Sequence, residues 1–422
     1  MSLIPAFSFA AFVFWLLALP MDGPLAAAAD VLNPSLWFLP GHILALTLAG
    51  LVPPAIPLRR LVPAAVPGVM LLTFATALWP DGAPLLLFLL GICAAPLLLA
   101  AGQAMSGAAN PALQAAIGLV AGNLALLMLT LSPLPLPWGQ LIAALPLLLF
   151  LRQPYPDHPP LAIPTTVWRY LPLVLIYHLS GGLLYGHLFP AYQRHAVLPG
   201  LELIFYVAAV GIALRLVRNR LETPLVCGFF FAMLAFILLQ WGPAVNAGMF
   251  AMQTGAGFVD LFLLAFLLRR DIPLRAFAFG NALLCLGLFA GGLLGRHLDA
   301  VPQGITTAGN LVLYASLLLL FLAPRSIGRP NDDEVEEVVE KPPPPGDDVQ
   351  PAAVTQMPCN IRLLLSEREC LVLSHSLTGQ TYRETAEKLA ISESSVKTYM
   401  KRIYEKLEVS GRKELLQRLA NL

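Results

Sequence analysis

The chain has 422 residues, of which 57% are hydrophobic and only 12% are charged, and its formal net charge at pH 7 is +1. This composition excludes an ordinary soluble globular protein and indicates a polytopic membrane protein. The charge is unevenly distributed, because residues 1–329 contain 14 arginines, 9 acids and no lysine, whereas residues 359–422 contain 11 lysines and arginines and 8 acids, a net of +3. Two parts with different physical character are therefore expected.

The first part is a series of apolar runs, most of them close to the roughly 20 residues that cross a bilayer as a helix. Twelve spans are predicted, at residues 3–20, 36–57, 61–79, 83–101, 111–132, 137–151, 166–189, 198–216, 224–241, 244–268, 273–295 and 306–324. The alternative for the first run, a cleaved signal peptide, is disfavoured because the run has no cationic start and no clear cleavage site. Because the run at 137–151 is short, ten or eleven spans are the alternative count.

Arginines between the spans indicate the orientation. With twelve spans and a cytoplasmic N-terminus, two arginines, Arg194 and Arg296, fall in outer loops. Eleven fall in cytoplasmic loops or the C-terminal segment: Arg59, Arg60, Arg152, Arg215, Arg218, Arg220, Arg269, Arg270, Arg275, Arg325 and Arg329. Since cytoplasmic loops are enriched in positive charge, the sequence predicts a multi-pass protein of the bacterial cytoplasmic (inner) membrane with its C-terminal domain in the cytoplasm.

A proline-rich connector divides the spans into two groups of six. Residues 152–164 contain Pro154, Pro156, Pro159 and Pro160, which favour extended chain over helix. A layout of six plus six resembles that of major-facilitator transporters, although Arg59 and Arg60 stand alone where that family has its signature loop. The predicted fold class is all-α: a transmembrane helical bundle of about twelve helices, followed by a small helical domain.

Several polar side chains interrupt the spans, where they are costly and mark candidates for function. Tyr177 and His178 lie in the seventh span, and Gln253 and Asp260 lie in the tenth. These four are the candidate ligand- or ion-sensing residues. A buried structural pair is the alternative for His178 and Asp260. The remaining ionisable residues of the seventh and eighth spans are expected at the membrane interfaces; they are Arg169, His187 and Glu202.

No motif in the sequence indicates an enzyme. The five cysteines have no CxxC spacing, so neither a disulfide framework nor a zinc site is predicted. The sequence has no Walker loop, no GxGxxG after a strand and no nucleophile motif in a suitable setting. No catalytic residue, metal or cofactor is therefore predicted.

Residues 327–358 are predicted to form an acidic, proline-rich linker. Six acids lie in residues 331–340, and Pro342 begins a run of four prolines. Such a segment cannot bury enough apolar surface to fold, and about 30 residues of flexible chain span roughly 30 Å. It serves either as a solvated spacer or as a cover for a basic surface of the next domain. The predicted domains are 1–326, 327–358 and 359–422.

The C-terminal segment has three marked helix starts. Ser366-x-x-Glu369 and Thr381-x-x-Glu384 are capping-box patterns, and Ser392 caps a third helix. The helices are expected at about 366–377, 382–389 and 392–407. In the third, an apolar stripe of Val396, Met400, Ile403 and Leu407 lies opposite Lys397 and Lys401, which are one turn apart. A recognition helix for the DNA major groove needs this arrangement; an ordinary solvated amphipathic helix is the alternative.

These residues resemble the LuxR-type helix-turn-helix. The resemblance rests on Ser366–Glu369, Gly379-x-x-x-x-Glu384-x-Ala386, Leu389-x-Ile391-Ser392, Ser395–Thr398 and Ile403-Tyr404-x-Lys406-Leu407. It implies a four-helix domain whose third helix reads DNA and whose fourth supplies a dimer contact. It also implies base-edge roles for Lys397, Thr398 and Lys401, and phosphate roles for Ser395, Arg402 and Lys406. The other candidate DNA-binding residues are Thr381, Tyr382, Ser392, Ser394, Val396 and Tyr399. Tyr399 stands where the family often has histidine, and Thr385 where it usually has isoleucine.

The last predicted helix, from about Arg412 to Leu422, carries Leu415, Leu416 and Leu419, which either close the small core or pair two chains. The whole sequence predicts a membrane-embedded one-component transcription regulator. A twelve-helix transporter with a regulatory tail is the alternative, and a membrane anchor for a constitutive DNA binder is a third hypothesis. The expected partners are double-stranded DNA, the lipid bilayer and an unknown small-molecule or ion signal. A homodimer through the C-terminal helix and RNA polymerase are further candidate partners.

Overall fold

The computed structural model describes residues 2–52, 57–132, 134–155, 163–239, 241, 244–297, 302–322, 365–377, 380–389, 391–407, 409 and 414–415. The chain forms two compact units, Met1–Arg329 and Pro330–Leu422. All regular structure in the described residues is helical. The predicted linker, residues 327–358, lies outside the described residues.

Among the described residues, the first half of the first unit contains seven α-helices: α1 (Ile4–Ala18), α2 (Pro24–Ala28), α3 (Pro34–Leu51), α4 (Leu58–Leu78), α5 (Ala83–Ser106), α6 (Pro111–Leu131) and α7 (Leu136–Ala144). Two short 3₁₀ segments adjoin them, η1 (Pro80–Gly82) before α5 and η2 (Leu145–Arg152) after α7. Each of the first six predicted spans corresponds to one helix, with α7 and η2 together forming the sixth. The short helix α2 was not expected from the sequence.

The second half contains α8 (Thr165–His195), α9 (Leu201–Val217), α10 (Thr223–Leu239), α11 (Val245–Leu267), α12 (Leu274–His297) and α13 (Pro302–Leu322). These correspond to predicted spans seven to twelve. Six of the described helices are individually long and apolar enough to cross a membrane: α3, α4, α5 with η1, α6, α11 and α12. The predicted transmembrane bundle is therefore confirmed.

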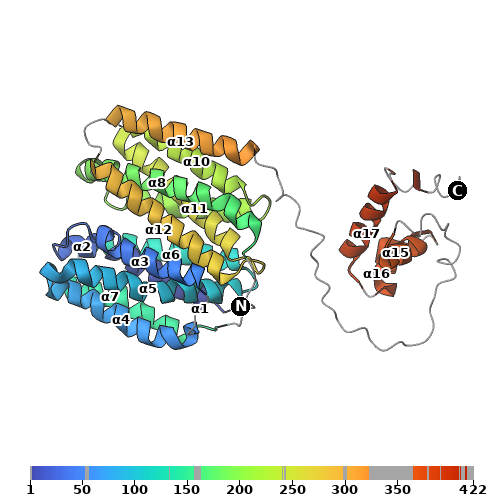
Figure 1. The fold of residues 1–422 in the computed structure, drawn as a ribbon, viewed down its shortest axis with the longest axis horizontal. Helices are drawn as coiled ribbons and strands as arrows, with labels where there is room; N and C mark the ends of the chain where they lie inside the picture. The colour runs from blue at the N-terminus through green and yellow to red at the C-terminus, as the bar shows by residue number, and fades with distance from the viewer. Residues whose placement is uncertain are drawn as a thin grey trace. The chain divides into compact units, whose positions relative to one another are not determined.

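The helices pack into two halves (Figure 1). In the first half α1 packs on α6, and α3 and α4 pack on α5; in the second, α8 packs on α12 and α11 on α9 and α10. Between the halves, α3 contacts α12 and α6 contacts α9. The start of α1 and the end of α13 lie at the same end of this unit, as an even number of crossings requires (Figure 1).

Buried polar side chains join helices within the first half. Trp15 on α1 donates from Nε1 to Oγ1 of Thr73 on α4 at 2.9 Å, and Gln140 on α7 donates to the Thr73 carbonyl at 3.1 Å. His42 on α3 lies 2.9 Å through Nδ1 from the carbonyl of Gly91 on α5. Each bond satisfies a polar group that would otherwise be costly in an apolar interior.

One arginine connects the two halves at a helix end. Arg275, near the start of α12, donates from Nε to the Gly50 carbonyl at 2.9 Å and from Nη2 to the Leu51 carbonyl at 2.7 Å. These carbonyls belong to the last turn of α3, where no helical amide follows to pair with them. The guanidinium therefore caps α3 and holds the start of α12 against it.

The second unit has its own core. Its described helices are α15 (Glu367–Leu377), α16 (Tyr382–Lys388) and α17 (Glu393–Lys406), within a residue or two of the predicted bounds. The core contains Val372, Leu373, Val396, Met400, Ile403, Leu407 and Leu415. Leu415 is 1% exposed, and Glu414 and Leu415 are helical. Leu416 and Leu419 lie outside the described residues.

Candidate functional site

The second unit starts α16 with a capping box. The Thr381 amide donates to Oε2 of Glu384 at 2.8 Å, and the Glu384 amide donates to the Thr381 hydroxyl at 3.3 Å. Hydrogen bonding with the backbone and side chain of Thr381 holds the pKa of Glu384 below its ordinary value. Thr381 is exposed, whereas Tyr382 is half-buried and packs on the core. The position predicted to carry an unusual hydroxyl, Thr385, is buried at 2% exposure.

The second capping box also fixes the end of α17. The Ser366 amide donates to Oε2 of Glu369 at 2.7 Å, and the Glu369 amide donates back to the Ser366 hydroxyl at 3.4 Å. The same carboxylate accepts from Nζ of Lys406 at 2.8 Å. Burial alone would raise the pKa of Glu369, but the hydrogen bonds with Lys406 and Ser366 outweigh it and lower that pKa. One carboxylate therefore joins the start of α15 to the last turn of α17.

The helix α17 begins at a serine cap and has one buried face. Ser392 accepts at Oγ from the Ser395 amide at 3.1 Å. The predicted apolar stripe is buried, with exposures of 1% for Val396 and Met400, 0% for Ile403 and 2% for Leu407. Since Val396 lies in the core, its contribution is to hold the helix in place. The stripe fixes which face of α17 points outward.

The outward face of α17 is cationic. Lys397 and Lys401 are exposed, and Ser395, Thr398, Tyr399 and Arg402 are half-buried. Lys397 pairs through Nζ with Oε1 of Glu393 at 2.8 Å, one turn earlier. This hydrogen bond and the attraction of the carboxylate raise the pKa of Lys397. Nothing is described for the side chain of Ser394. The arrangement presents two lysines, one turn apart, near the N-terminal half of the helix.

In the membrane unit, three of the four candidate sensing residues lie together. His178 on α8 places Nε2 3.3 Å from Oδ1 of Asp260 on α11. Tyr206 on α9 donates to Oδ2 of the same carboxylate at 2.8 Å. The ring of Tyr177 meets the His178 ring edge-on, with centroids 5.3 Å apart. Gln253 lies two turns before Asp260 on α11 and does not join the described hydrogen bonds of this cluster. The cluster therefore connects α8, α9 and α11.

Residues 363–419 match a protein family described as bacterial regulatory proteins, luxR family. The second unit contains a LuxR-type helix-turn-helix. In the LuxR-type domain, α15, α16 and α17 take the places of the first three helices that the resemblance implied. The family supports a role in transcription regulation for this part of the chain and implies that the domain is cytoplasmic.

The first unit is similar in fold to solved transporters. The human organic anion transporter TETRAN gives a TM-score of 0.54 at 17% identity, over 75% of this chain and 97% of that chain. FucP, a Major Facilitator Superfamily transporter in the outward conformation, gives 0.52 at 12% identity over 75% and 97%. A bacterial homologue of the iron transporter ferroportin, in the outward-facing state, gives 0.51 at 17% identity over 76% and 95%. Comparison with curated protein sequences gives no significant match.

These likenesses establish a major-facilitator-like fold for the membrane unit, in addition to the LuxR-type domain in the second unit. The predicted grouping of six plus six spans is thereby confirmed. Because the identities are low, the likeness extends to the fold alone, and the transported substrates belong to those proteins.

Two residues of these sites were not predicted from the sequence. Glu393, the partner of Lys397 in the LuxR-type domain, could have been found from the spacing of four residues on one helix face. Tyr206 lies 54 residues before Asp260 on another helix. No local pattern predicts such a contact, which depends on how α9 packs on α11.

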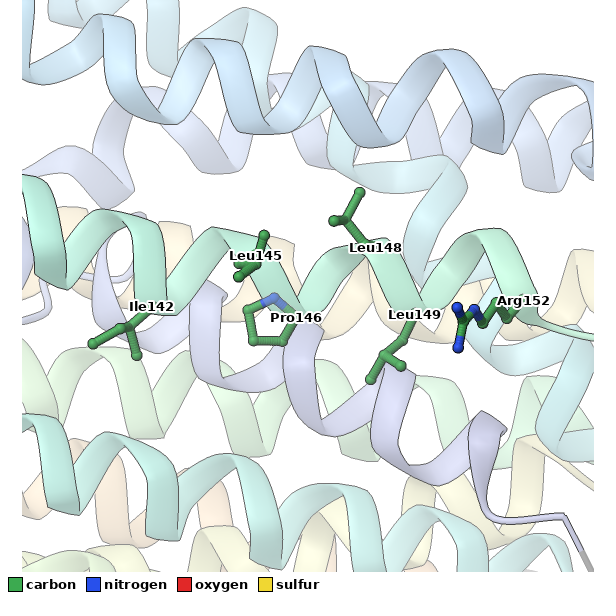
Figure 2. A pocket seen from close by; sticks show the side chains of 6 residues that line it. All are labelled: Ile142, Leu145, Pro146, Leu148, Leu149 and Arg152. Atoms are coloured by element: carbon green, nitrogen blue, oxygen red, sulfur yellow. The ribbon is translucent and has the colours of Figure 1, made fainter.

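The pocket in Figure 2 lies along α7 and η2 and has a volume of about 520 Å³. Its lining is Ile142, Leu145, Pro146, Leu148, Leu149 and Arg152. Ile142, Leu145 and Leu148 are each more than 40% exposed, as expected for side chains on the outer face of a membrane bundle.

Proposed function

We propose that the chain is a membrane-embedded one-component transcription regulator, in which residues 1–326 sense a signal and residues 359–422 bind DNA, joined by the linker 327–358. The observation that carries the proposal is the orientation of α17. Its buried stripe turns Lys397 and Lys401 outward, next to the serine-capped start of the helix. A helix that reads the major groove presents this kind of face to base edges.

Lys397, Thr398 and Lys401 are the proposed readers of base edges. Ser395 and Arg402 flank them and are proposed to contact phosphates, with Thr381, Tyr382, Ser392, Ser394 and Tyr399 at the periphery. Lys406 is 45% exposed but already paired with Glu369, so its proposed phosphate contact would share its charge with that carboxylate. Phosphate contacts supply most of the affinity and make it salt-dependent, whereas base contacts select the sequence.

The membrane unit is proposed to lie in the bacterial cytoplasmic membrane. The excess of arginine in the loops on one side supports this orientation, and so does the even number of predicted crossings, which is consistent with both ends of the unit on that side. From there the linker gives the LuxR-type domain access to DNA. A second copy bound through the C-terminal helix, and RNA polymerase, are the further proposed partners. No enzymatic role is proposed.

A sensing role is favoured over a bare anchor because an anchor requires one span. The signal is proposed to act at Tyr177, His178 and Asp260, with Gln253 on the same helix. The second candidate function is a transporter with a regulatory tail, favoured by the major-facilitator-like fold. A transporter predicts flux that needs Asp260 or His178 and that survives deletion of residues 357–422.

The DNA contacts are tested with purified residues 357–422 at fixed salt. Lys397→Ala and Lys401→Ala are each expected to weaken binding to a specific duplex by about 5- to 150-fold, the range for one good base contact. Lys388→Ala, which removes an equal charge from α16, is the matched control and is expected to bind within a few-fold of the wild type. Unchanged affinity in both α17 variants would refute the assignment.

The target genes are found by mapping the DNA bound by the full chain in cells, with and without Lys397→Ala. Sites lost in the variant identify the operator. Light scattering of residues 357–422 on such a duplex then tests the dimer, which a strictly monomeric complex would rule out.

A further inference from the structure

The hydrogen bonds of His178 fix where its protons lie. Nδ1 is 2.8 Å from the carbonyl oxygen of Val174, one turn earlier on α8. A carbonyl oxygen can only accept, so Nδ1 carries a hydrogen and donates it. In a neutral imidazole the other nitrogen, Nε2, then has a lone pair and no hydrogen.

That second nitrogen faces a carboxylate. Nε2 lies 3.3 Å from Oδ1 of Asp260. A neutral histidine and an ionised aspartate would place two acceptors opposite each other, which is repulsive. The contact is favourable only when one more proton is present, either on Nε2 as an imidazolium or on Asp260 as a carboxylic acid. The other oxygen, Oδ2, accepts from Tyr206 at 2.8 Å and so is already satisfied.

The surroundings offer few other groups that could neutralise the pair. The side chain of His178 is 6% exposed and that of Asp260 is 25% exposed. The other tyrosines and cysteines of the neighbouring helices are Tyr170, Tyr177, Tyr185 and Tyr192 on α8, Tyr206 on α9, Cys227 on α10 and Cys285 on α12. Of these, Tyr177 contacts His178 and Tyr206 contacts Asp260. His195 and His297 are the last residues of α8 and α12. The charged residues of these helices otherwise lie toward helix ends: Arg169, Arg194, Glu202, Arg215, Arg275 and Arg296. His187 follows His178 by nine residues, about 14 Å along α8.

We propose that His178 and Asp260 form a site that holds one proton between α8 and α11. With the proton bound, the pair is neutral overall and joins the two helices. When the proton leaves to water, the pair carries one negative charge, the bond between Nε2 and Oδ1 is lost, and the two helices are no longer joined there. The bound species is thus a proton, and its release is the change that the site reports.

The position of His178 connects this site to the contact between the halves. A β-carbon added at Gly287 of α12 would lie 2.9 Å from Cβ of His178, so α12 passes directly over this residue. The same helix α12 packs on α3 of the other half. A shift of α8 on proton release would therefore press on α12. The claim that this movement forms part of the signal rests on the proposed sensor function. The proton site itself does not depend on that function.

The site is tested on the full chain in lipid nanodiscs, without DNA, by thermal unfolding across about pH 5 to 8, where histidine ordinarily titrates. The Tm of the wild type is expected to fall by several degrees as the pH rises through the range in which the pair releases its proton. Asp260→Asn is expected to lack this step, because its amide N–H donates to Nε2 while its oxygen still accepts from Tyr206. The control is Glu202→Gln, another buried carboxyl, bonded to Tyr192 at 2.6 Å, which should keep the step.

An equal pH dependence in wild type and Asp260→Asn would overturn the proposal. If Asp260→Asn does not fold, infrared difference spectra of the wild type and His178→Gln decide the matter: carboxyl or imidazole bands that change with pH in the wild type and not in His178→Gln support the site, and identical difference spectra refute it. A reporter for the target genes then distinguishes the proton site from the proposed regulator function. A variant that loses the pH-dependent step in Tm but still binds DNA has lost the proton site alone.

Discussion

At the residue scale, Lys397 is held by a neighbour before it meets DNA. Its ammonium is 2.8 Å from Oε1 of Glu393, at the N-terminal end of α17. A carboxylate at the N-terminal end of a helix interacts favourably with the helix dipole but repels the phosphates of DNA. Glu393 therefore lowers the attraction of α17 for any DNA while keeping Lys397 oriented along the helix.

We expect Glu393→Gln to raise the affinity of residues 357–422 for a nonspecific duplex several-fold at low salt. The gain should shrink as salt is added, since it comes from exposed charges. Fluorescence anisotropy titrations measure it. The matched control is Glu387→Gln, which removes the same charge from the exposed pair with Arg383 at 3.3 Å on α16 and should have a smaller effect. Equal gains in affinity in both variants would mean that the net charge of the domain alone sets its affinity for the duplex.

A different carboxylate, Glu369, holds the LuxR-type domain together. Glu369→Gln removes the ion pair with Lys406 and should destabilise residues 357–422 by about 1–2 kcal/mol, measured by urea unfolding at neutral pH. Because the pKa of Glu369 is lowered on folding, its contribution is fully present above the ordinary value of 4.5 and is lost as the pH falls through the folded pKa.

The difference in stability between wild type and Glu369→Gln should therefore close below pH 4.5. Glu384→Gln is the comparison, because Glu384 has the same capping role but is exposed. A constant difference down to acid pH would contradict the ion pair as the cause.

The capping residues were predictable because each box closes over three residues of sequence. The helix starts are capped as the local pattern indicated, by Thr381 with Glu384, by Ser366 with Glu369, and by Ser392. The pair of Glu369 and Lys406 spans 37 residues and depends on the fold of the whole domain, so no spacing rule indicates it. The same holds for the meeting of His178 with Asp260, 82 residues away.

At the scale of elements, α8 and α12 approach until their backbones nearly touch. A β-carbon at Gly291 would lie 2.1 Å from the Leu179 carbonyl oxygen, and one at Gly182 would lie 2.5 Å from the Leu288 carbonyl oxygen. In a membrane, where lipid is as apolar as the side chains, such close packing of small residues replaces the hydrophobic drive for helix association.

Gly291→Ala should therefore destabilise the full chain by about 1–3 kcal/mol, as expected for an added group in a close-packed interface. The adjacent Gly292 gives a matched control, since nothing lies within 4 Å of a β-carbon built there, and Gly292→Ala should be neutral. Thermal unfolding in nanodiscs measures both. Similar Tm values for the two variants would show that α8 and α12 are not packed this closely.

Hydropathy predicted the helices but not their irregular parts. The seventh span was expected to end at residue 189, whereas α8 continues to His195, because its last turns are too polar to be recognised as membrane helix. The run at 137–151 is divided into α7 and the 3₁₀ segment η2, whose second residue is Pro146. Proline lacks the amide that would continue the α-helical bonding, which accounts for the change. The alanine-rich α2 is too short for any periodicity to appear.

At the scale of the whole molecule, one chain combines a transporter-like fold with a LuxR-type domain. The arrangement of the two halves, with α3 on α12 and α6 on α9, could not be derived from a single sequence, because it rests on contacts between helices far apart in the chain. The count of spans and the distribution of arginine were sufficient to predict that both ends of the membrane unit lie on one side.

The two functions that this combination permits make opposite predictions for deletion of residues 357–422. If the chain is a regulator, the deletion abolishes the response of its target genes, and neither the full chain nor the truncated chain moves a proton or solute across a liposome membrane, because binding at Asp260 only shifts the packing of α8 and α12. If it is a transporter, flux persists after the deletion and is lost in Asp260→Asn.

Lys397→Ala in the full chain is the control for DNA binding alone: it should match the deletion in gene response and leave the membrane unit unchanged. Measurable flux in the truncated chain would refute the regulator as the sole function.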